Sequence, residues 1–152
     1  MICCWEWGVN GGCLSAVSGI GISVDSSGNA YVIGNFEGTA TFGSTQLKSS
    51  EDRDIFIARL SSDGVWQWVI KAGGSSDDIG MDIVVDLRGN AYVTGYFKEN
   101  VTFDGTNFTS SGNSDIFIAK FSNNETLDSD IDGVINVADN CPSISNQNQN
   151  DT

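Results

Sequence analysis

Histidine is absent from this sequence, and several other residue types that support common functions are scarce. The 152 residues include no His, one Pro, four Cys, and only seven Lys and Arg against 20 Asp and Glu. Without His, the chain has neither a His-dependent catalytic triad nor the usual zinc ligands, and its cysteines show no Cys-x-x-Cys spacing. A formal net charge of −13 argues against nucleic acid as a partner, because phosphate binding needs Lys and Arg.

Long hydrophobic runs are also missing. No stretch approaches the roughly 18 apolar residues of a membrane-spanning helix, so we expect no membrane span. Residues 1–7 lack the basic region and apolar core of a secretory signal, so we expect any export signal to lie upstream of this sequence. Cys3, Cys4 and Cys13 have no counterparts in the repeat described next, and we assign them no role.

Glycine, in contrast, is abundant, and the chain repeats itself. The 18 glycines suit a β-rich chain with many tight turns, because Gly readily adopts positive φ. Residues 5–63 and 66–124 align without a gap at an offset of 61, and 26 of the 59 positions are identical. The longest shared runs begin at Gly28 and again at Gly89. A period of this length indicates two copies of one supersecondary unit.

Each unit predicts four antiparallel strands. In the first unit they are expected at residues 22–24, 30–36, 55–60 and 65–70, with a short pairing at 39–42 between the second and third. The third strand is apolar on both faces apart from Arg59, which suits a sheet covered on both sides. We therefore predict an all-β fold of two four-stranded antiparallel propeller-type blades, a fragment of a larger β-propeller. Similar sheets should lie side by side at residues 20–70 and 81–121, and a parallel β-solenoid is the alternative.

Four features resemble one family. They are Gly-Asn-Ala-Tyr-Val, Asp-Ile-Phe-Ile-Ala, the Asp-Gly turn before Trp-x-Trp, and the Gly-Gly before the next unit. Through them, residues 5–124 resemble the bacterial β-propeller repeat of exported, often very large proteins. We therefore assign residues 1–124 to the propeller blades. The resemblance implies the fold and an extracellular or cell-surface location. Residues 5–10 look like a fourth strand, and no fourth strand follows Phe121, so we expect neighbouring blades to lie outside this sequence.

Residues 125–152 form a separate acidic segment with six acids and no Lys or Arg. Carboxylates occupy positions 1, 3, 5 and 12 of a twelve-residue loop, Gly133 allows the turn at position 6, and positions 7 and 9 add a carbonyl and an amide oxygen. The predicted Ca²⁺ ligands are Asp128, Asp130, Asp132, Val134, Asn136 and Asp139. A disordered acidic linker is the alternative interpretation.

After this loop, residues 139–142 read Asp-Asn-Cys-Pro. Together with the aspartates before them, they resemble the thrombospondin type 3 repeat over residues 128–152. The resemblance implies calcium-wrapped loops and a disulfide between Cys141 and a cysteine of a neighbouring repeat. Ile131 and Asn136 depart from the family pattern, and the missing carboxylate at 136 predicts weak binding.

These features predict a non-enzymatic, secreted or cell-surface structural and adhesive protein that binds an extracellular protein or glycan. The alternative is a glycan-binding or polysaccharide-degrading propeller in which acids such as Asp63 or Asp82 act. Other acids recur in both units, and we interpret these as turn and cap residues: Asp25 with Asp86, and Asp54 with Asp115.

Two further groups have a structural and a functional interpretation. The repeated tryptophans at positions 5, 7, 66 and 68 suit either a core or an aromatic sugar platform, and we expect the core. Asp77 and Asp78 precede a strand, where a solvated loop is expected rather than an ion site.

Overall fold

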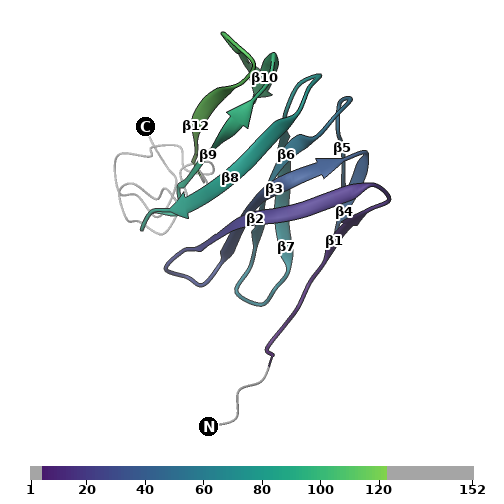
Figure 1. Cartoon of the computed structure of the whole chain (residues 1–152). Helices are drawn as coiled ribbons and strands as arrows, with labels where there is room; N and C mark the ends of the chain where they lie inside the picture. The colour runs from purple at the N-terminus through teal and green to yellow at the C-terminus, as the bar shows by residue number, and fades with distance from the viewer. Residues whose placement is uncertain (1–4, 123–152) are drawn as a thin grey trace, which may run out of the picture. The chain divides into compact units, whose positions relative to one another are not determined.

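The structure is a computed structural model that describes residues 5–122, and every regular element in that range is a strand. No helix there is long and apolar enough to cross a membrane. The chain divides into a first unit that ends at Phe121 and a second that begins at Ser122 (Figure 1). The strands are β1 (Gly11–Cys13), β2 (Ala16–Val24), β3 (Ala30–Glu37), β4 (Thr39–Phe42), β5 (Thr45–Lys48), β6 (Asp54–Leu60), β7 (Trp66–Ala72), β8 (Asp78–Val85), β9 (Ala91–Phe97), β10 (Asn100–Phe103), β11 (Thr106–Thr109) and β12 (Asp115–Phe121).

The first repeat forms a four-stranded antiparallel sheet in the order β2-β3-β6-β7, which we call the first sheet. Consecutive strands pair directly, apart from the β4-β5 hairpin inserted between β3 and β6. β6 is buried along nearly its whole length, as expected for a strand that is apolar on both faces. The four strands and the short pairing predicted for this unit are confirmed.

The second repeat forms a three-stranded sheet in the order β8-β9-β12, which we call the second sheet. Within residues 5–122, β12 has no strand beyond it, in agreement with the expectation that the second unit reaches only its third strand at Phe121, so this blade has three strands here rather than four. The repeat itself is confirmed in detail. A β-bulge lies between Gly19 and Gly21 in the first sheet, and the same irregularity recurs between Gly80 and Asp82 in the second.

The segment that follows each fourth strand also repeats. Gly12 in β1 pairs with Thr41 in β4, and Gly73 after β7 makes an isolated bridge with Thr102 in β10. Both pairs are related by the offset of 61. The equivalent glycine therefore pairs with the equivalent hairpin strand in both repeats, although only in the second does it follow a strand, β7.

Residues 5–10 do not form a strand, which corrects the expected opening strand. Trp5 is 97% exposed, so the expected core role is wrong for this residue. Trp7 lies against the turn at Gly64, where its indole Nε1 donates a hydrogen bond to the Ser62 carbonyl, and it helps to line a groove on the rear face of the first sheet. A strand needs a neighbour to satisfy its backbone groups, and no strand lies beside residues 5–10 in the described part of the chain.

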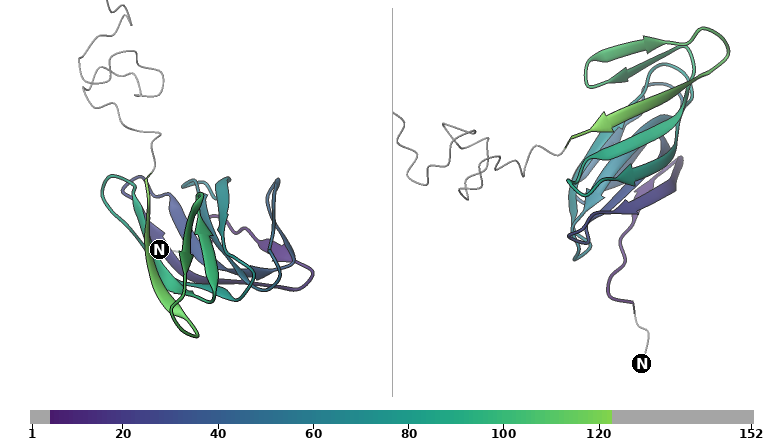
Figure 2. Two further views of the ribbon diagram at one scale, coloured as in Figure 1. Left: turned by 90° about the horizontal axis from the view of Figure 1, so that it is seen from above. Right: turned by 90° about the vertical axis from the view of Figure 1, so that its left-hand side faces the viewer.

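The two sheets pack face to face, with β8 lying along the first sheet next to β2 and β3 (Figure 1; Figure 2). The larger core cluster lies between them and includes Tyr31, Ile33, Ile55 and Ile57 from the first sheet. A smaller cluster lies on the opposite side of the first sheet, where Phe42 of β4 contacts Phe56 of β6. The predicted pair of similar, adjacent antiparallel sheets is confirmed.

Because side chains alternate along a strand, each sheet has two faces. We call the face of the first sheet that packs on the second the forward face; it carries Tyr31, Ile33, Ile55, Ile57, Trp68 and Ile70. The opposite one is the rear face, with Ile22, Val24, Val32, Phe36, Phe56 and Leu60. Shifted by 61, the rear face becomes the surface of the second sheet that receives the first: Ile83, Val85, Val93, Phe97, Phe117 and Phe121.

Candidate functional site

The predicted calcium ligands lie outside the described residues. They are Asp128, Asp130, Asp132, Val134, Asn136 and Asp139, and the calcium site remains a prediction. Between residues 5 and 122, no three or more His, Cys, Asp or Glu side chains gather closely enough to hold a metal ion. A candidate site must therefore be sought among loops, clefts and sheet faces.

Two carboxylates are completely buried where β6 and β8 begin. Asp54 Oδ2 accepts hydrogen bonds from the Ser50 amide at 2.9 Å and from Lys71 Nζ at 2.7 Å. Asp78 Oδ2 accepts one from the Gly74 amide at 2.6 Å. The Oδ1 atom of each has no hydrogen-bond partner, and Asp54 Oδ1 contacts Gly73, where a Cβ atom would collide with it.

The solvated loop expected for Asp78 is wrong, because the side chain is fully buried at the start of β8. Burial penalises its charged form, and the charge of Asp54 opposes ionisation as well; together they raise the pKa of Asp78 to about 6 despite the Gly74 hydrogen bond. Asp54 is also fully buried but has the Lys71 ammonium beside it.

Asp77, next along the chain, lies in a different environment. It accepts hydrogen bonds from Arg53 Nε at 2.9 Å and from Lys98 Nζ at 3.1 Å. The Arg53 hydrogen bond is the main reason that the pKa of Asp77 lies below its usual range. This exposed ion-pair network ties the loop after β7 to the loops around it and leaves no open carboxylate pair there.

The recurring acids are turn and cap residues, as expected. Asp25 Oδ1 accepts hydrogen bonds from the backbone amides of Ser27 and Asn29, and Asp86 makes the same two bonds one repeat later. Asp115 caps the loop before β12 through the Ser111 amide, as Asp54 does before β6. These bonds satisfy loop amides, so the same acids recur for structural reasons.

The two acids of the hydrolytic alternative lie on different elements. Asp63 is exposed in the turn between β6 and β7, and Asp82 is exposed within β8, where it accepts a hydrogen bond from the Ile83 amide. Neither residue hydrogen-bonds to the other in the described structure.

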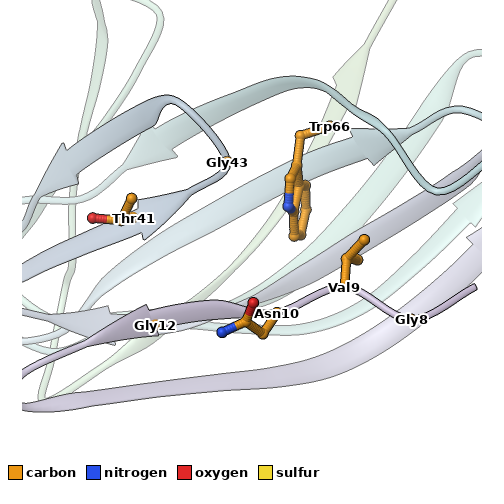
Figure 3. Close-up of a pocket in the computed structure, with 7 residues that line it drawn as sticks. All are labelled: Gly8, Val9, Asn10, Gly12, Thr41, Gly43 and Trp66. Atoms are coloured by element: carbon orange, nitrogen blue, oxygen red, sulfur yellow. The ribbon is translucent and has the colours of Figure 1, made fainter.

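A cleft of about 500 Å³ opens beside Trp66, at the beginning of β7. Figure 3 shows the indole ring extending toward Val9, with Asn10 nearby and Thr41 on the adjacent strand. Its other lining residues are glycines, including Gly43, whose added Cβ would contact the Trp66 ring at 3.0 Å. The cleft offers one aromatic face and two neutral polar side chains.

Exposed apolar residues lie on the two outer sheet faces. Comparing equivalent residues of the two repeats shows which positions are uncovered on each face. Ile55 and Ile57 are 0% and 4% exposed, whereas their counterparts Ile116 and Ile118 are 77% and 76% exposed. The aromatic pair behaves in the same way, since Tyr31 is fully buried and Tyr92 is 37% exposed. Identical residues are covered on the forward face of the first sheet and uncovered on that of the second.

Part of the rear face shows the reverse difference. Phe36 and Phe56 are buried against β4, and their counterparts Phe97 and Phe117 are buried too, so the difference is confined to the part near β2. Ile22 is 68% exposed on the first sheet, while its counterpart Ile83 is 2% exposed on the second.

One groove lies on the rear face of the first sheet, where Gly19, Ile22 and Val32 line it together with Trp7. Another lies along β12 beside the β10-β11 hairpin, lined by residues such as Ile118 and Phe108. Exposed contiguous apolar surface of this kind is typical of an interaction site.

Comparison with known proteins agrees with this geometry for one segment. A family model described as a beta-propeller repeat matches residues 67–96, which run from β7 through β8 to β9. The search of curated proteins found no match. Fold and match together define the class: the chain is an all-β repeat protein that contains a β-propeller-type repeat. Nothing in the comparisons shows a thrombospondin type 3 repeat.

Sequence reasoning missed two features of this surface. The burial of Asp78 has no signal in the repeat, because its counterpart in the first unit is Val17. The unequal exposure of identical residues could have been suspected from the sequence, because no fourth strand is predicted after Phe121. Which face is left open cannot be predicted without knowing how the sheets stack.

Proposed function

We propose that this chain is a non-enzymatic structural repeat module of an exported or cell-surface adhesive protein. The observation that carries the proposal concerns the two outer sheet faces. The forward face of the second sheet and part of the rear face of the first are open, and inside the chain the equivalent forward and rear faces pack against each other. A module of this design continues through further sheets, and its loops remain available to an extracellular protein or glycan.

The acids support a structural role rather than catalysis. Asp25, Asp54, Asp86 and Asp115 cap turns and loops, and Asp77 is paired with Arg53 and Lys98. A glycosidase needs two carboxyl groups placed on either side of one bond. Asp63 lies in the exposed β6–β7 turn and Asp82 in β8, and no described contact joins them.

Calcium is the second part of the proposal. The spacing of Asp128, Asp130, Asp132 and Asp139, with Asn136 and the Val134 carbonyl, suits one Ca²⁺ ion. Four carboxylates in twelve residues repel one another, so the ion stabilises an arrangement that is unfavourable without it. Such a segment would stiffen the connection between the sheets and whatever follows them.

A calcium titration of the full chain, followed residue by residue by NMR, tests this function. We expect shifts confined to residues 128–139, with a dissociation constant of about 10⁻⁴–10⁻³ M. Asp130→Ala should abolish them, while Asp63→Ala, which removes an exposed turn carboxylate, should leave them unchanged. Resonances of residues 128–139 that ignore calcium up to about 10 mM, roughly ten times the weak limit, would overturn the calcium assignment.

The Trp66 cleft is the observation that favours the glycan-binding alternative, because sugars stack on exposed indole faces. A glycan-array screen of the chain separates the two functions. The structural function predicts no glycan whose binding depends on Trp66. A glycan that is bound by the native chain and lost in Trp66→Ala would establish the alternative.

A further inference from the structure

Two incomplete features of the fold match each other. β12 pairs with β9 on one side and, within residues 5–122, with no strand on the other. Residues 5–10 are in no strand, although they correspond to the first six residues of β7 at the offset of 61. In this described range the second sheet thus lacks a fourth strand, and a segment with the sequence of that strand is unpaired.

In the first sheet, the fourth strand shows how such a segment is bound. β7 pairs with β6 along its length, its Trp68 ring lies 6.0 Å from the Tyr31 ring, and its Trp66 ring lies 5.4 Å from Phe42. One repeat later, the corresponding surfaces are β12, Tyr92 and Phe103. Trp7 and Trp5 correspond to Trp68 and Trp66, and neither contacts those surfaces in the single chain.

The chain direction at β1 already suits this pairing. After β7, Gly73 bridges to Thr102 of the following repeat; after residues 5–10, Gly12 pairs with Thr41 in the same way. β1 therefore occupies its place in the repeat, and the segment before it runs away from β1 (Figure 1), held to the β6–β7 turn by the Trp7 hydrogen bond to Ser62.

We propose that a second copy of this chain supplies the missing strand and continues the repeat. Residues 5–10 of one copy pair with β12 of another, and the rear face of the first covers the forward face of the second. The internal interface between the two sheets is the template for this contact. Each surface in the proposed contact is equivalent, at an offset of 61, to a surface in the internal interface. This inference rests on the proposed structural function and names the partner of the open faces.

The contact is head-to-tail, since the two surfaces that meet are different. Such contacts close into a ring or continue as a filament. Propellers commonly close with about four to eight blades, so closure of two-repeat chains takes about two to four copies. The rearrangement gives up the hydrogen bond from Trp7 to Ser62 and gains strand pairing along β12.

Gly19 offers a clean way to block the rear face. It is exposed, and a Cβ there would meet only Val32 Cγ1 at 3.7 Å, an ordinary contact. Its counterpart Gly80 lies in the internal interface, where a Cβ would approach Ile33 to 2.6 Å. Gly19→Leu should therefore leave the single chain folded and prevent a second copy from seating. Ile118→Asp blocks the forward face in the same way, at an exposed position.

Light scattering on the full chain at micromolar to millimolar concentration tests the proposal. The native chain should have a mass of at least twice the 16.2 kDa of one chain, and each variant alone should have the mass of one. An equimolar mixture of Gly19→Leu and Ile118→Asp should form a dimer, because the mixture retains one intact face of each kind.

Three results would overturn the proposal: a native chain that stays monomeric, a Gly19→Leu chain that assembles as the native one does, or a mixture that stays monomeric. Circular dichroism of each variant confirms that the strands are retained, and Gly80→Leu, which should unfold, is the matched control. Calcium binding at residues 128–139 is measured independently, so a monomeric chain that binds calcium would reject the assembly alone.

Discussion

At the scale of single residues, Asp78 combines complete burial with a charge that nothing neutralises directly. The Gly74 amide donates a hydrogen bond to Oδ2 at 2.6 Å, but no cation among the described residues pairs with the carboxylate, and the neighbouring Asp54 carries the same charge. Its sequence neighbour Asp77 is half-exposed and paired with two cations. Adjacent aspartates thus have opposite effects on the pH dependence of stability.

This contrast gives a prediction. The pKa of Asp78 rises from 3.8 to about 6 on folding, so the folded state holds the proton more tightly. Its contribution to the unfolding free energy is favourable below pH 3.8 and declines as the pH rises to about 6. In Asp78→Asn, unfolding by urea should therefore show less loss of stability over this range than in the native chain.

Asp77→Asn is the matched control, with the opposite sign. The pKa of Asp77 is lowered by folding, so its contribution is present above the unfolded value and is lost as the pH falls. An Asp78→Asn chain with the native pH dependence would show that Asp78 titrates normally and is accessible to water.

At the scale of elements, the turns that precede the two hairpins both contain a residue with positive φ, but the residue differs between the repeats. Gly38 precedes β4 with φ of 79°, and Glu99 occupies the same place before β10 with φ of 56°. Positive φ costs a residue with a Cβ atom about 1–2 kcal/mol relative to its ordinary conformations. The second repeat therefore carries strain that glycine avoids in the first.

Placing Gly at position 99 should remove the strain of that turn, and placing Glu at position 38 should introduce it. Glu99→Gly is expected to raise the unfolding free energy by about 1 kcal/mol, and Gly38→Glu to lower it by at least as much. Gly38→Glu also brings a Cβ within 3.3 Å of Ser15 Oγ. Gly112→Ala, at a position without positive φ and with open space around it, is the control for glycine replacement in a loop. Denaturant melts measure all three, and a destabilised Glu99→Gly chain would contradict this account of the turns.

The strands themselves could be predicted from sequence, and their neighbours could not. The local strand and turn signals locate β3, β6 and β7 within about two residues, but they found only the last three residues of β2, which begins at Ala16. Residues 5–10 carry the same signals as β7 yet form no strand, because pairing depends on a partner. Trp5 was expected in the core for the same reason, and it lies exposed.

At the scale of the whole molecule, most of the fold that could be predicted follows from the 61-residue repeat. The offset of 61 predicted two similar sheets, and the bulges at Gly19 and Gly80 confirm it in detail. The direction of stacking could not be predicted, because both faces of β6 are apolar. The calcium residues from Asp128 to Asp139 lie outside the described residues and remain a prediction.

The central claim is that one repeat has its forward face covered and the next has the same face open. Ile57 and Ile118 test it most directly, because they are the same residue at equivalent positions, one buried and one exposed. The measurement is the unfolding free energy of Ile57→Ala and Ile118→Ala, each in the Gly19→Leu background, which keeps the chain monomeric. Ile57→Ala should cost about 2–5 kcal/mol, since it leaves a cavity between the sheets, and Ile118→Ala less than about 0.5 kcal/mol. Equal costs at the two positions would contradict the account.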